Sequence, residues 1–369
     1  MEFLRVTYEL AVPLPEAESR AEGIAREQTV EVPRVVVRDA FIAEHVLGRV
    51  EQVAAAGEEG RSRATIAYPA DATGLDPAQT LGVLFGNSSL AADVRCVDIE
   101  VPESLARALG GPRHGLEALR AATGAADRAL TCTAVKPLGH RPEALADLLR
   151  AFGRAGIDVV KDDQGLANQA FCPFEARVRA CLGAVEEVAD ATGHRVLYAP
   201  NLIGTPGRVF DELRLAEDLG ARAVMASPML IGLPTFSEIC ARSSVPVLAH
   251  PSHGGAVAYA PELLFGKLLR LYGADAVIFV GYGGRFETPR PACASIADGL
   301  RAPWAGLRPS LPVPGGGIEL ENAAEIVSFY GRDTMLLVGG SLQLDDAGPE
   351  ARSRAFVQAV HDASAALPA

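Results

Sequence analysis

The sequence predicts an α/β protein in which a (β/α)8 TIM barrel follows an N-terminal α+β domain. Eight short apolar runs succeed one another between residues 130 and 341, and helix-compatible segments separate most of them. Nearly continuous apolar strands that alternate with helices are typical of a parallel sheet covered on its faces. Eight such units in about 215 residues approach the usual size of this barrel. A doubly wound open sheet is the competing architecture, but it rarely needs eight consecutive units.

The N-terminal part, residues 1–125, alternates strands and helices without a strict rhythm, which is the pattern of an α+β domain. We expect it to be ferredoxin-like, and we expect the barrel to occupy residues 126–369. The predicted strands are Phe3–Leu10, Val30–Val36, Ala64–Tyr68 and Arg95–Val101. The predicted helices are Glu16–Arg26 and Ala78–Leu84, and a helical segment at 115–128 leads into the barrel.

The eight barrel strands are predicted from the apolar runs alone. They are 130–137, 157–163, 194–201, 221–228, 245–252, 276–284, 310–318 and 335–341. In such a barrel the C-terminal ends of the strands form the floor of the active site. The polar residues and glycines at these ends are Lys136, Lys161, Asp162, Asp163, Asn201, Ser227, His250, Gly281, Gly283, Gly284, Gly315–Gly317, Gly339 and Gly340. One such residue would be a solvated turn, but the whole set indicates a site.

Charge and composition exclude several classes of partner. The net charge of −12 argues against general binding to nucleic acid or to anionic membranes, because the summed field repels both. No apolar run reaches about 18 residues, and charges within the first five residues argue against a signal peptide. The six cysteines form no CxxC pair, so we expect neither a zinc site nor a disulfide scaffold, and a cytoplasmic location.

Two glycine clusters predict a phosphate site. Gly316 and Gly317 follow the seventh strand, and Gly339 and Gly340 follow the eighth. Glycine lets backbone N–H groups approach an anion, and these two loops are the usual phosphate-binding loops of the barrel. The alternative is a pair of tight turns.

The second strand ends in charges, GIDVVKDDQG at 156–165. Lys161 beside Asp163 is either a plain ion pair or a reactive amine. A lysine with a lowered pKa can react with carbon dioxide to form a carbamate, an oxygen ligand. With Asp163 and Gln164, the carbamate would then hold Mg²⁺, which prefers oxygen ligands.

These segments carry a resemblance to a known family. GIDVVKDDQGLANQ at 156–169, with TAVKPLG at 133–139, resembles the metal-binding segment of the large subunit of ribulose-bisphosphate carboxylase (RuBisCO). The closest resemblance is to the RuBisCO-like proteins, the form IV branch that does not fix carbon. It extends from about residue 27 to residue 341.

The resemblance implies roles for individual residues. Lys136 matches the lysine that moves a proton during enolisation, and Lys161 matches the carbamylated metal ligand. His250 matches a histidine near the substrate. Glu27 and Asn87 match residues that reach the site of a neighbouring subunit, which implies a homodimer or a larger oligomer of dimers. The implied metal ligands are Lys161, Asp163 and Gln164, and the implied substrate-binding residues are Gly316, Gly317, Gly339, Gly340, Arg285 and Asn201.

The chain departs from the family pattern at several of these positions. Gln164 replaces a glutamate ligand, which weakens Mg²⁺ binding. Pro251 replaces an arginine that holds a second phosphate, and an apolar residue near Ile278 replaces a histidine. Arg285 replaces the mobile-loop lysine that carboxylation needs. We therefore expect no carbon fixation and a monophosphate substrate.

Three functions remain open at this point. The first is decarboxylation of a 3-oxo sugar-acid phosphate of the 3-oxo-isoapionate-4-phosphate type, a lyase reaction, which the GLANQ context favours. The second is an enolase or isomerase of methylthio-pentose phosphates in methionine salvage. The third is a non-catalytic, phosphate-binding regulatory protein. Both enzymatic functions use an enediolate formed next to a carbonyl.

Overall fold

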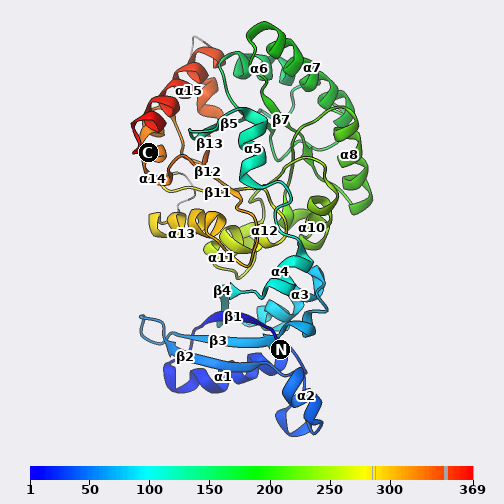
Figure 1. Cartoon of the computed structure of the whole chain (residues 1–369), viewed down its shortest axis with the longest axis vertical. Coiled ribbons are helices and arrows are strands. Elements are labelled where there is room, and N and C mark those ends of the chain that lie inside the picture. Colours follow the sequence, from blue (N-terminus) through cyan, green and yellow to red (C-terminus); the bar gives the residue numbers. More distant parts are fainter. Residues whose placement is uncertain (285, 287, 345–347, 369) are drawn as a thin grey trace.

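The computed structural model describes residues 1–284, 286, 288–344 and 348–368. It has two parts, an antiparallel sheet built by the first hundred residues and a parallel barrel built by the rest (Figure 1). The mixed α/β fold class predicted from the sequence is confirmed. The proposed domain limits, 1–125 and 126–369, stay a prediction.

The N-terminal sheet has four antiparallel strands in the order β2-β3-β1-β4. They are β1 (Phe3–Leu10), β2 (Arg49–Ala55), β3 (Ser62–Pro69) and β4 (Val94–Glu100). Every second residue of β1 is buried, because alternate side chains of a strand point to opposite faces. Helix α1 (Leu14–Glu27) packs its small residues Ala17 and Ala21 together with Ile24 into the core of this part.

One N-terminal strand was predicted in the wrong place. Val30–Val36 is not a strand, because Pro33 precedes a 3-10 turn at Arg34–Val36 and these residues are largely exposed. The real strand is β2, whose sequence RVEQVAA lies at the edge of the sheet with no residue fully buried. An edge strand without a buried face lacks the alternation by which strands are recognised.

Among the described residues, the barrel sheet has nine parallel strands in the order β7-β6-β5-β13-β12-β11-β10-β9-β8. They are β5 (Leu130–Val135), β6 (Val159–Asp162), β7 (Leu197–Ala199), β8 (Asn201–Leu202), β9 (Val224–Ala226), β10 (Val247–Ala249), β11 (Ala276–Val280), β12 (Leu311–Gly315) and β13 (Met335–Leu337). Strands β7 and β8 are the two halves of the third predicted strand, and only Pro200 separates them. Proline has no N–H for the ladder, so the strand is interrupted there. All eight predicted runs therefore contain barrel strands.

Helices surround the barrel and connect its strands (Figure 1). The α-helices are α1 (Leu14–Glu27), α2 (Ala40–His45), α3 (Pro77–Phe85), α4 (Glu103–Leu109), α5 (Gly115–Thr123), α6 (Pro142–Arg154), α7 (Phe174–Thr192), α8 (Pro206–Asp218), α9 (Pro228–Ile231), α10 (Leu233–Arg242), α11 (Pro261–Leu263), α12 (Leu269–Leu271), α13 (Arg290–Arg301), α14 (Ala323–Tyr330) and α15 (Pro349–Ala366). The shorter turns are the 3-10 segments η1 (Arg34–Val36), η2 (Ala70–Thr73), η3 (Asn87–Leu90), η4 (Gly254–Ala256), η6 (Leu320–Asn322) and η7 (Gly340–Gln343), and the π-turn η5 (Leu264–Leu268). Several helices begin with proline, whose missing N–H costs nothing in the first turn. No helix in the described ranges is both long and apolar enough to cross a membrane.

One end of the barrel is closed by α5. Its side chains Leu116 and Leu119 join the interior cluster of Leu130, Met335 and the other inward-facing strand residues. In Figure 1 this helix lies across the front of the barrel. Because α5 covers the N-terminal ends of the strands, the C-terminal ends are left to form a site.

Strand β4 fastens the N-terminal sheet to the barrel. The Cys96 N–H donates to Ala258 O at 3.1 Å, and the Ala260 N–H donates to Cys96 O at 2.9 Å. The Tyr272 hydroxyl donates to Pro77 O at 2.8 Å. The sheet is thus attached to the side of the barrel near α11 (Figure 1).

Candidate active site

The barrel strands direct the predicted polar residues into one space. Inward-facing residues such as Cys132, Val159 and Leu248 form the interior cluster, while their chain neighbours pack outward against the helices. Because side chains alternate along a strand, every second residue after these also faces inward, as far as the C-terminal ends of the strands. The residues reached on the inward face are Lys136, Lys161, Asp163, Asn201 and His250. Residues from four separate segments therefore lie together at the C-terminal end of the barrel, which we call the mouth.

Lys136 and Asp163 form an ion pair across the ends of β5 and β6. The Lys136 Nζ lies 3.2 Å from Asp163 Oδ1, and both side chains are partly exposed. The same oxygen has no aligned hydrogen bond from any described residue. The pair is therefore a Coulombic contact that leaves a carboxylate oxygen available to a ligand.

Lys161 is a buried amine, only 2% exposed. Its Nζ donates to Asp162 O at 3.1 Å. Burial lowers the pKa of this amine from 10.5, and the charge of Lys136 lowers it further. Cys132 and Asp163 oppose the shift. The barrel therefore increases the neutral, nucleophilic fraction of Lys161, which is the form that a carbamate or a general base requires.

His250 follows β10 and is held by its own loop. Its Nδ1 accepts the Ser252 N–H at 3.3 Å and lies 2.9 Å from Ser252 Oγ. A nitrogen that accepts an N–H carries no proton, so we assign the neutral ring's proton to Nε2. Burial lowers the pKa of His250 to about 2, and the charges of Lys161 and Lys136 contribute. His250 is thus a neutral hydrogen-bond donor at pH 7.

Several buried polar atoms at the mouth make no hydrogen bond to any residue that the structure describes. Asn201 donates from Nδ2 to Gln164 O at 3.1 Å and to Leu166 O at 2.9 Å, but its Oδ1 is unpaired. Among the described residues, the buried atoms without a hydrogen bond at the C-terminal ends of barrel strands are Asp163 Oδ1, which contacts Lys136 only as an ion pair, Asn201 Oδ1, Ser227 Oγ and Ser341 Oγ. Buried polar atoms nearly always have a partner, so an unpaired group at one mouth indicates a polar ligand. Ser341 was not predicted from the sequence, although it directly follows the second glycine cluster.

The glycine loops present free backbone donors. Within the described residues, the N–H groups of Gly316, Gly317, Gly339 and Gly340 make no hydrogen bond to the protein. A Cβ at Gly339 or Gly340 would meet open space, whereas one at Gly317 would lie 2.5 Å from Gly284 Cα. Gly317 has φ +108° and thus serves loop packing as well. Arg285, the predicted substrate ligand in the neighbouring loop, lies outside the described residues.

The predicted metal ligands are adjacent but incomplete. Among the described residues, no group of three or more His, Cys, Asp and Glu side chains is placed to hold a metal ion. Asp163 Oδ1 has the free coordination capacity that a metal needs, and Gln164 follows it in the same partly buried turn. Lys161 supplies an oxygen only as a carbamate. The set therefore fits Mg²⁺ only once Lys161 is carbamylated.

Glu27 and Asn87 are brought together, but not to the mouth. The Asn87 Nδ2 donates to Glu27 Oε1 at 3.0 Å, and both residues are exposed. They lie at the end of α1 and the start of η3, in the N-terminal part. Neither makes a hydrogen bond or ion pair with a barrel residue in the described ranges. Within one chain they are separate from the candidate site.

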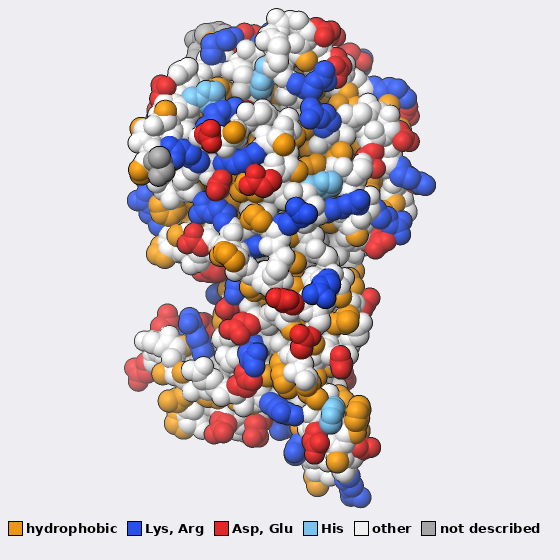
Figure 2. All heavy atoms as spheres, viewed as in Figure 1, with side chains coloured by type: hydrophobic (Ala, Val, Ile, Leu, Met, Phe, Trp, Pro, Cys, Tyr) orange, Lys and Arg blue, Asp and Glu red, His pale blue; other side chains and the backbone are white. Residues whose placement is uncertain are grey.

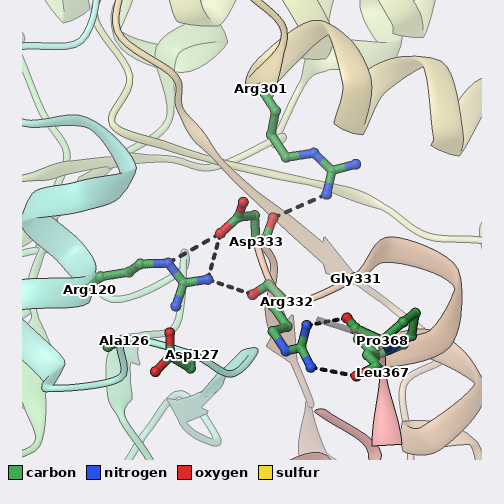
Figure 3. A pocket seen from close by; sticks show the side chains of 9 residues that line it. All are labelled: Arg120, Ala126, Asp127, Arg301, Gly331, Arg332, Asp333, Leu367 and Pro368. Atoms are coloured by element: carbon green, nitrogen blue, oxygen red, sulfur yellow. Dashed lines mark hydrogen bonds and ion pairs between the residues drawn. The ribbon is translucent and has the colours of Figure 1, made fainter. Parts of the chain in front are cut away.

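A cavity of about 510 Å³ at the opposite end of the barrel is not part of the site. Figure 3 shows its arginines engaged with protein groups. Arg120 Nη2 lies 2.6 Å from Asp333 Oδ1, and Arg332 donates to Leu367 O at 2.6 Å and Pro368 O at 2.7 Å. These contacts fasten the end of the chain beneath β13. The cavity therefore has a structural role.

Comparison with known proteins agrees with this architecture. Residues 115–366 match the profile of the family described as "Ribulose bisphosphate carboxylase large chain, catalytic domain". The chain belongs to the RuBisCO large-chain family. It is 44% identical over 338 residues to "Ribulose bisphosphate carboxylase-like protein 1" of Rhodopseudomonas palustris, covering 91% of this chain and 92% of that protein. The predicted place among the RuBisCO-like proteins is thus confirmed.

The chain is also similar to a relative named as an enzyme and to a solved RuBisCO-like structure. The chain is 41% identical to "5-methylthioribulose-1-phosphate isomerase" of Rhodospirillum rubrum, with 92% of this chain and 91% of that protein covered. The crystal structure of a Rubisco-like protein from Rhodopseudomonas palustris superposes with a TM-score of 0.90 at 39% identity, covering 98% of both chains. The RuBisCO-like chain thus has a relative that is named as an enzyme.

Proposed function

We propose that this RuBisCO-like chain is an isomerase that forms an enediolate from a ketose monophosphate, of the class to which 5-methylthioribulose 1-phosphate belongs. The observation that carries the proposal is the gathering of Lys136, Lys161, Asp163 and His250 beside unpaired polar atoms at one mouth. Such groups can remove a proton next to a carbonyl and stabilise the oxygen that becomes charged.

The name of one relative supports isomerisation over decarboxylation. The sequence favoured decarboxylation of a 3-oxo sugar-acid phosphate and kept methylthio-pentose isomerisation as the alternative. A relative that is 41% identical over nearly the whole chain is named as an isomerase of a methylthio-ketose phosphate. We therefore rank isomerisation first. The decarboxylase becomes the second candidate and the non-catalytic regulator the third.

The residues divide the chemistry among them. Lys136 is the group that moves the proton, because it is the partly exposed lysine and Asp163 lies 3.2 Å from its Nζ. Neutral His250 donates from Nε2 to an oxygen that becomes negative during enolisation. The free N–H groups of Gly316, Gly317, Gly339 and Gly340 bind the phosphate. Asn201 Oδ1 accepts from a substrate hydroxyl.

Carbamylated Lys161, Asp163 and Gln164 would hold Mg²⁺, which would polarise the substrate carbonyl. The neutral amide of Gln164 makes this a weaker site than one with a third carboxylate. Bicarbonate with Mg²⁺ should raise activity several-fold, and Gln164→Glu should lower the Mg²⁺ concentration for half-maximal activity. Full activity in EDTA without bicarbonate would assign Lys161 the role of a plain amine base.

The proposed enzyme is at least a homodimer. Glu27 and Asn87 are paired and exposed, far along the chain from the barrel residues that they would serve. Placed by a second copy over the mouth, they would add a carboxylate and an amide to the site. A monomer by light scattering with full activity would contradict this arrangement.

Product analysis tests the proposed reaction. The protein is incubated with 5-methylthioribulose 1-phosphate, and separately with a 3-oxo sugar-acid monophosphate, and both are followed by phosphorus NMR and carbon dioxide release. We expect a new ketose phosphate signal from the first substrate and no carbon dioxide from the second. Carbon dioxide release would restore the decarboxylase, and binding without turnover in both reactions would favour the regulatory protein.

A further inference from the structure

A buried ion pair lies directly behind the catalytic mouth. Asp162 stands between Lys161 and Asp163 but faces outward, beneath α7, and its side chain is fully buried. Its carboxylate accepts three hydrogen bonds, from Arg177 Nε at 2.9 Å, the Asn201 N–H at 3.0 Å and the Tyr198 hydroxyl at 2.7 Å. No separate role was predicted for Asp162, and Arg177 and Tyr198 were not singled out from the sequence.

Arg177 also fastens the loop that carries the candidate ligands. That loop, residues 163–173, joins β6 to α7 and contains Asp163 and Gln164. Arg177 Nη1 donates to Ala167 O at 2.7 Å and to Cys172 O at 3.2 Å. Its Nη2 has no partner among the described residues, so the guanidinium is held by its other two nitrogens. One side chain thus ties the end of β6 to the middle and the end of the loop.

The front of the same loop is fixed by Asn201. Its Nδ2 donates to Gln164 O and Leu166 O, while its backbone N–H binds Asp162. The loop is therefore held on both sides of Asp163. Because Lys161 and Asp163 flank Asp162 in the chain and point to the opposite face, a backbone rotation at Asp162 would displace both.

A buried ion pair is a poor device for stability alone. Replacing such a pair by apolar side chains is often neutral or stabilising, because desolvation offsets the Coulombic gain. Its value is directional, since a guanidinium fork and a carboxylate fix both distance and plane. Here Arg177 donates to Asp162 through Nε and to the loop through Nη1, and neither side chain of the ion pair is exposed.

We propose that Arg177, acting through Asp162 and supported by Tyr198, is a positioning residue that holds Asp163 and Lys161 in their reactive places. The proposal rests on the proposed isomerase function for its kinetic readout. Its structural readout is the Asp163 Oδ1 to Lys136 Nζ distance, 3.2 Å in this structure.

The kinetic experiment compares Arg177→Met and Arg177→Lys with Arg179→Met. Arg179 lies on the same helix, is exposed and pairs only with Glu175 among the described residues, which makes it a matched control. We expect Arg177→Met to lower kcat about 100-fold with KM nearly unchanged, since displacements near 1 Å cost about that much. Arg177→Lys should recover part of kcat, and Arg179→Met should match the wild type. A folded Arg177→Met protein with wild-type kcat would overturn the proposal.

A second variant, Tyr198→Phe, tests the proposal even if Arg177→Met does not fold. Tyr198→Phe keeps the ring and removes only the hydroxyl that donates to Asp162, so we expect a several-fold loss of kcat at an unchanged melting temperature. A lower melting temperature with unchanged kcat would show a purely structural role and overturn the proposal.

Crystal structures separate this proposal from the proposed function. If the wild-type protein turns over no ketose phosphate, the isomerase assignment fails, but the structures still decide. A longer Asp163 to Lys136 distance in Tyr198→Phe or Arg177→Met would support positioning. An unchanged distance would contradict it.

Discussion

At the scale of single residues, the barrel interior changes the ordinary chemistry of Lys161 and His250. Both are bases whose pKa burial lowers, and each lies within the field of other cations. A lowered pKa means that the unfolded chain binds more protons than the folded one between the two pKa values. Both residues therefore reduce stability when the pH falls. Their retention at the mouth is better explained by function than by stability.

Replacing Lys161 should separate activity from stability. We expect Lys161→Met to lower turnover roughly 100-fold or more, because it removes the carbamate that would hold Mg²⁺, whose stabilisation of developing charge is worth several kcal/mol. The variant should not melt below the wild type at pH 7, because it removes a buried amine that resists charging. Any gain should be largest at low pH and vanish as the pH approaches 10.5, the ordinary pKa of lysine. Thermal melts at several pH values check this, and a large loss of stability at neutral pH would show a structural lysine.

His250 should remain neutral throughout the physiological range. Its pKa of about 2 predicts no change in its ring nitrogen NMR shifts between pH 8 and pH 4. The stability cost should appear below pH 6.5, where a histidine in the unfolded chain takes up a proton. Lys136→Met removes one of the opposing charges and should raise the His250 pKa. Titration of His250 near pH 6.5 in the wild type would contradict the assigned environment.

The charged stretch "KDD" shows how far the sequence could go at this scale. Lys161 and Asp163 were predicted as site residues, and strand alternation places both on the inner face. The same alternation sends Asp162 outward, which was available from the sequence. Its partners Arg177 and Tyr198 were not, because only the folded chain brings α7 and β7 to it.

At the scale of elements, the two glycine loops differ in what they tolerate. Gly340 has no positive φ and its Cβ direction is open, whereas Gly317 has φ +108° and touches Gly284. The loop of Gly339 and Gly340 therefore has room for a ligand, whereas the loop of Gly316 and Gly317 is packed against its neighbour. Both are predicted phosphate loops, but only one should accept a side chain without strain.

Gly340→Val should block ligand binding and leave the fold intact. Calorimetry with inorganic phosphate or a ketose phosphate should show at least a ten-fold loss of affinity, while the melting temperature stays unchanged. Gly317→Ala should instead destabilise by about 1–3 kcal/mol or more, the usual cost of a strained backbone position. Gly183→Ala, on α7 with open space around it, is the control for both. Unchanged affinity in a folded Gly340→Val protein would remove the phosphate site from this loop.

Apolar barrel strands were predictable, and edges and interruptions were not. All eight barrel runs were found because strands buried on both faces are continuously apolar. Strand β2 was not predicted, because its residues are half exposed at the edge of the sheet. Val30–Val36 was predicted as a strand from its composition alone. The break at Pro200 could be predicted from the sequence, but the pairing of β7 with β6 and of β8 with β9 required the structure.

At the scale of the whole molecule, both parts of the described chain expose large apolar side chains. One set follows the C-terminal ends of barrel strands, comprising Leu138, Phe171, Leu230, Phe286 and Leu344. The other lies in the N-terminal part, comprising Met1, Leu14, Val32, Val35, Val36, Phe41, Ile42, Leu75 and Leu90. Figure 2 shows hydrophobic side chains on the projecting lobe that α2 forms. Contiguous apolar surface marks contact sites, so we expect the proposed dimer to cover the lobe that α2 forms.

Mixing two inactive variants tests whether the site is shared between chains. Glu27→Gln damages the N-terminal contribution and Lys161→Met damages the barrel. If each site takes parts from two chains, random mixed dimers should recover about a quarter of wild-type activity, since half are mixed and each has one intact site. Glu27→Gln mixed with Asn87→Ala should recover none, because both lesions lie in the same part. Absence of recovery in the first mixture, with exchange of chains verified, would show that each chain holds its own site.

The proposed site removes a proton next to a carbonyl at the mouth of the barrel. Proton NMR in deuterium oxide measures this directly, by the loss of the signal at the carbon beside the carbonyl of 5-methylthioribulose 1-phosphate. We expect enzyme-dependent exchange of deuterium into the substrate or its isomer, and none with Lys161→Met at equal concentration. A wild-type protein that binds this ketose phosphate without exchanging any proton would show that the site does not form an enediolate.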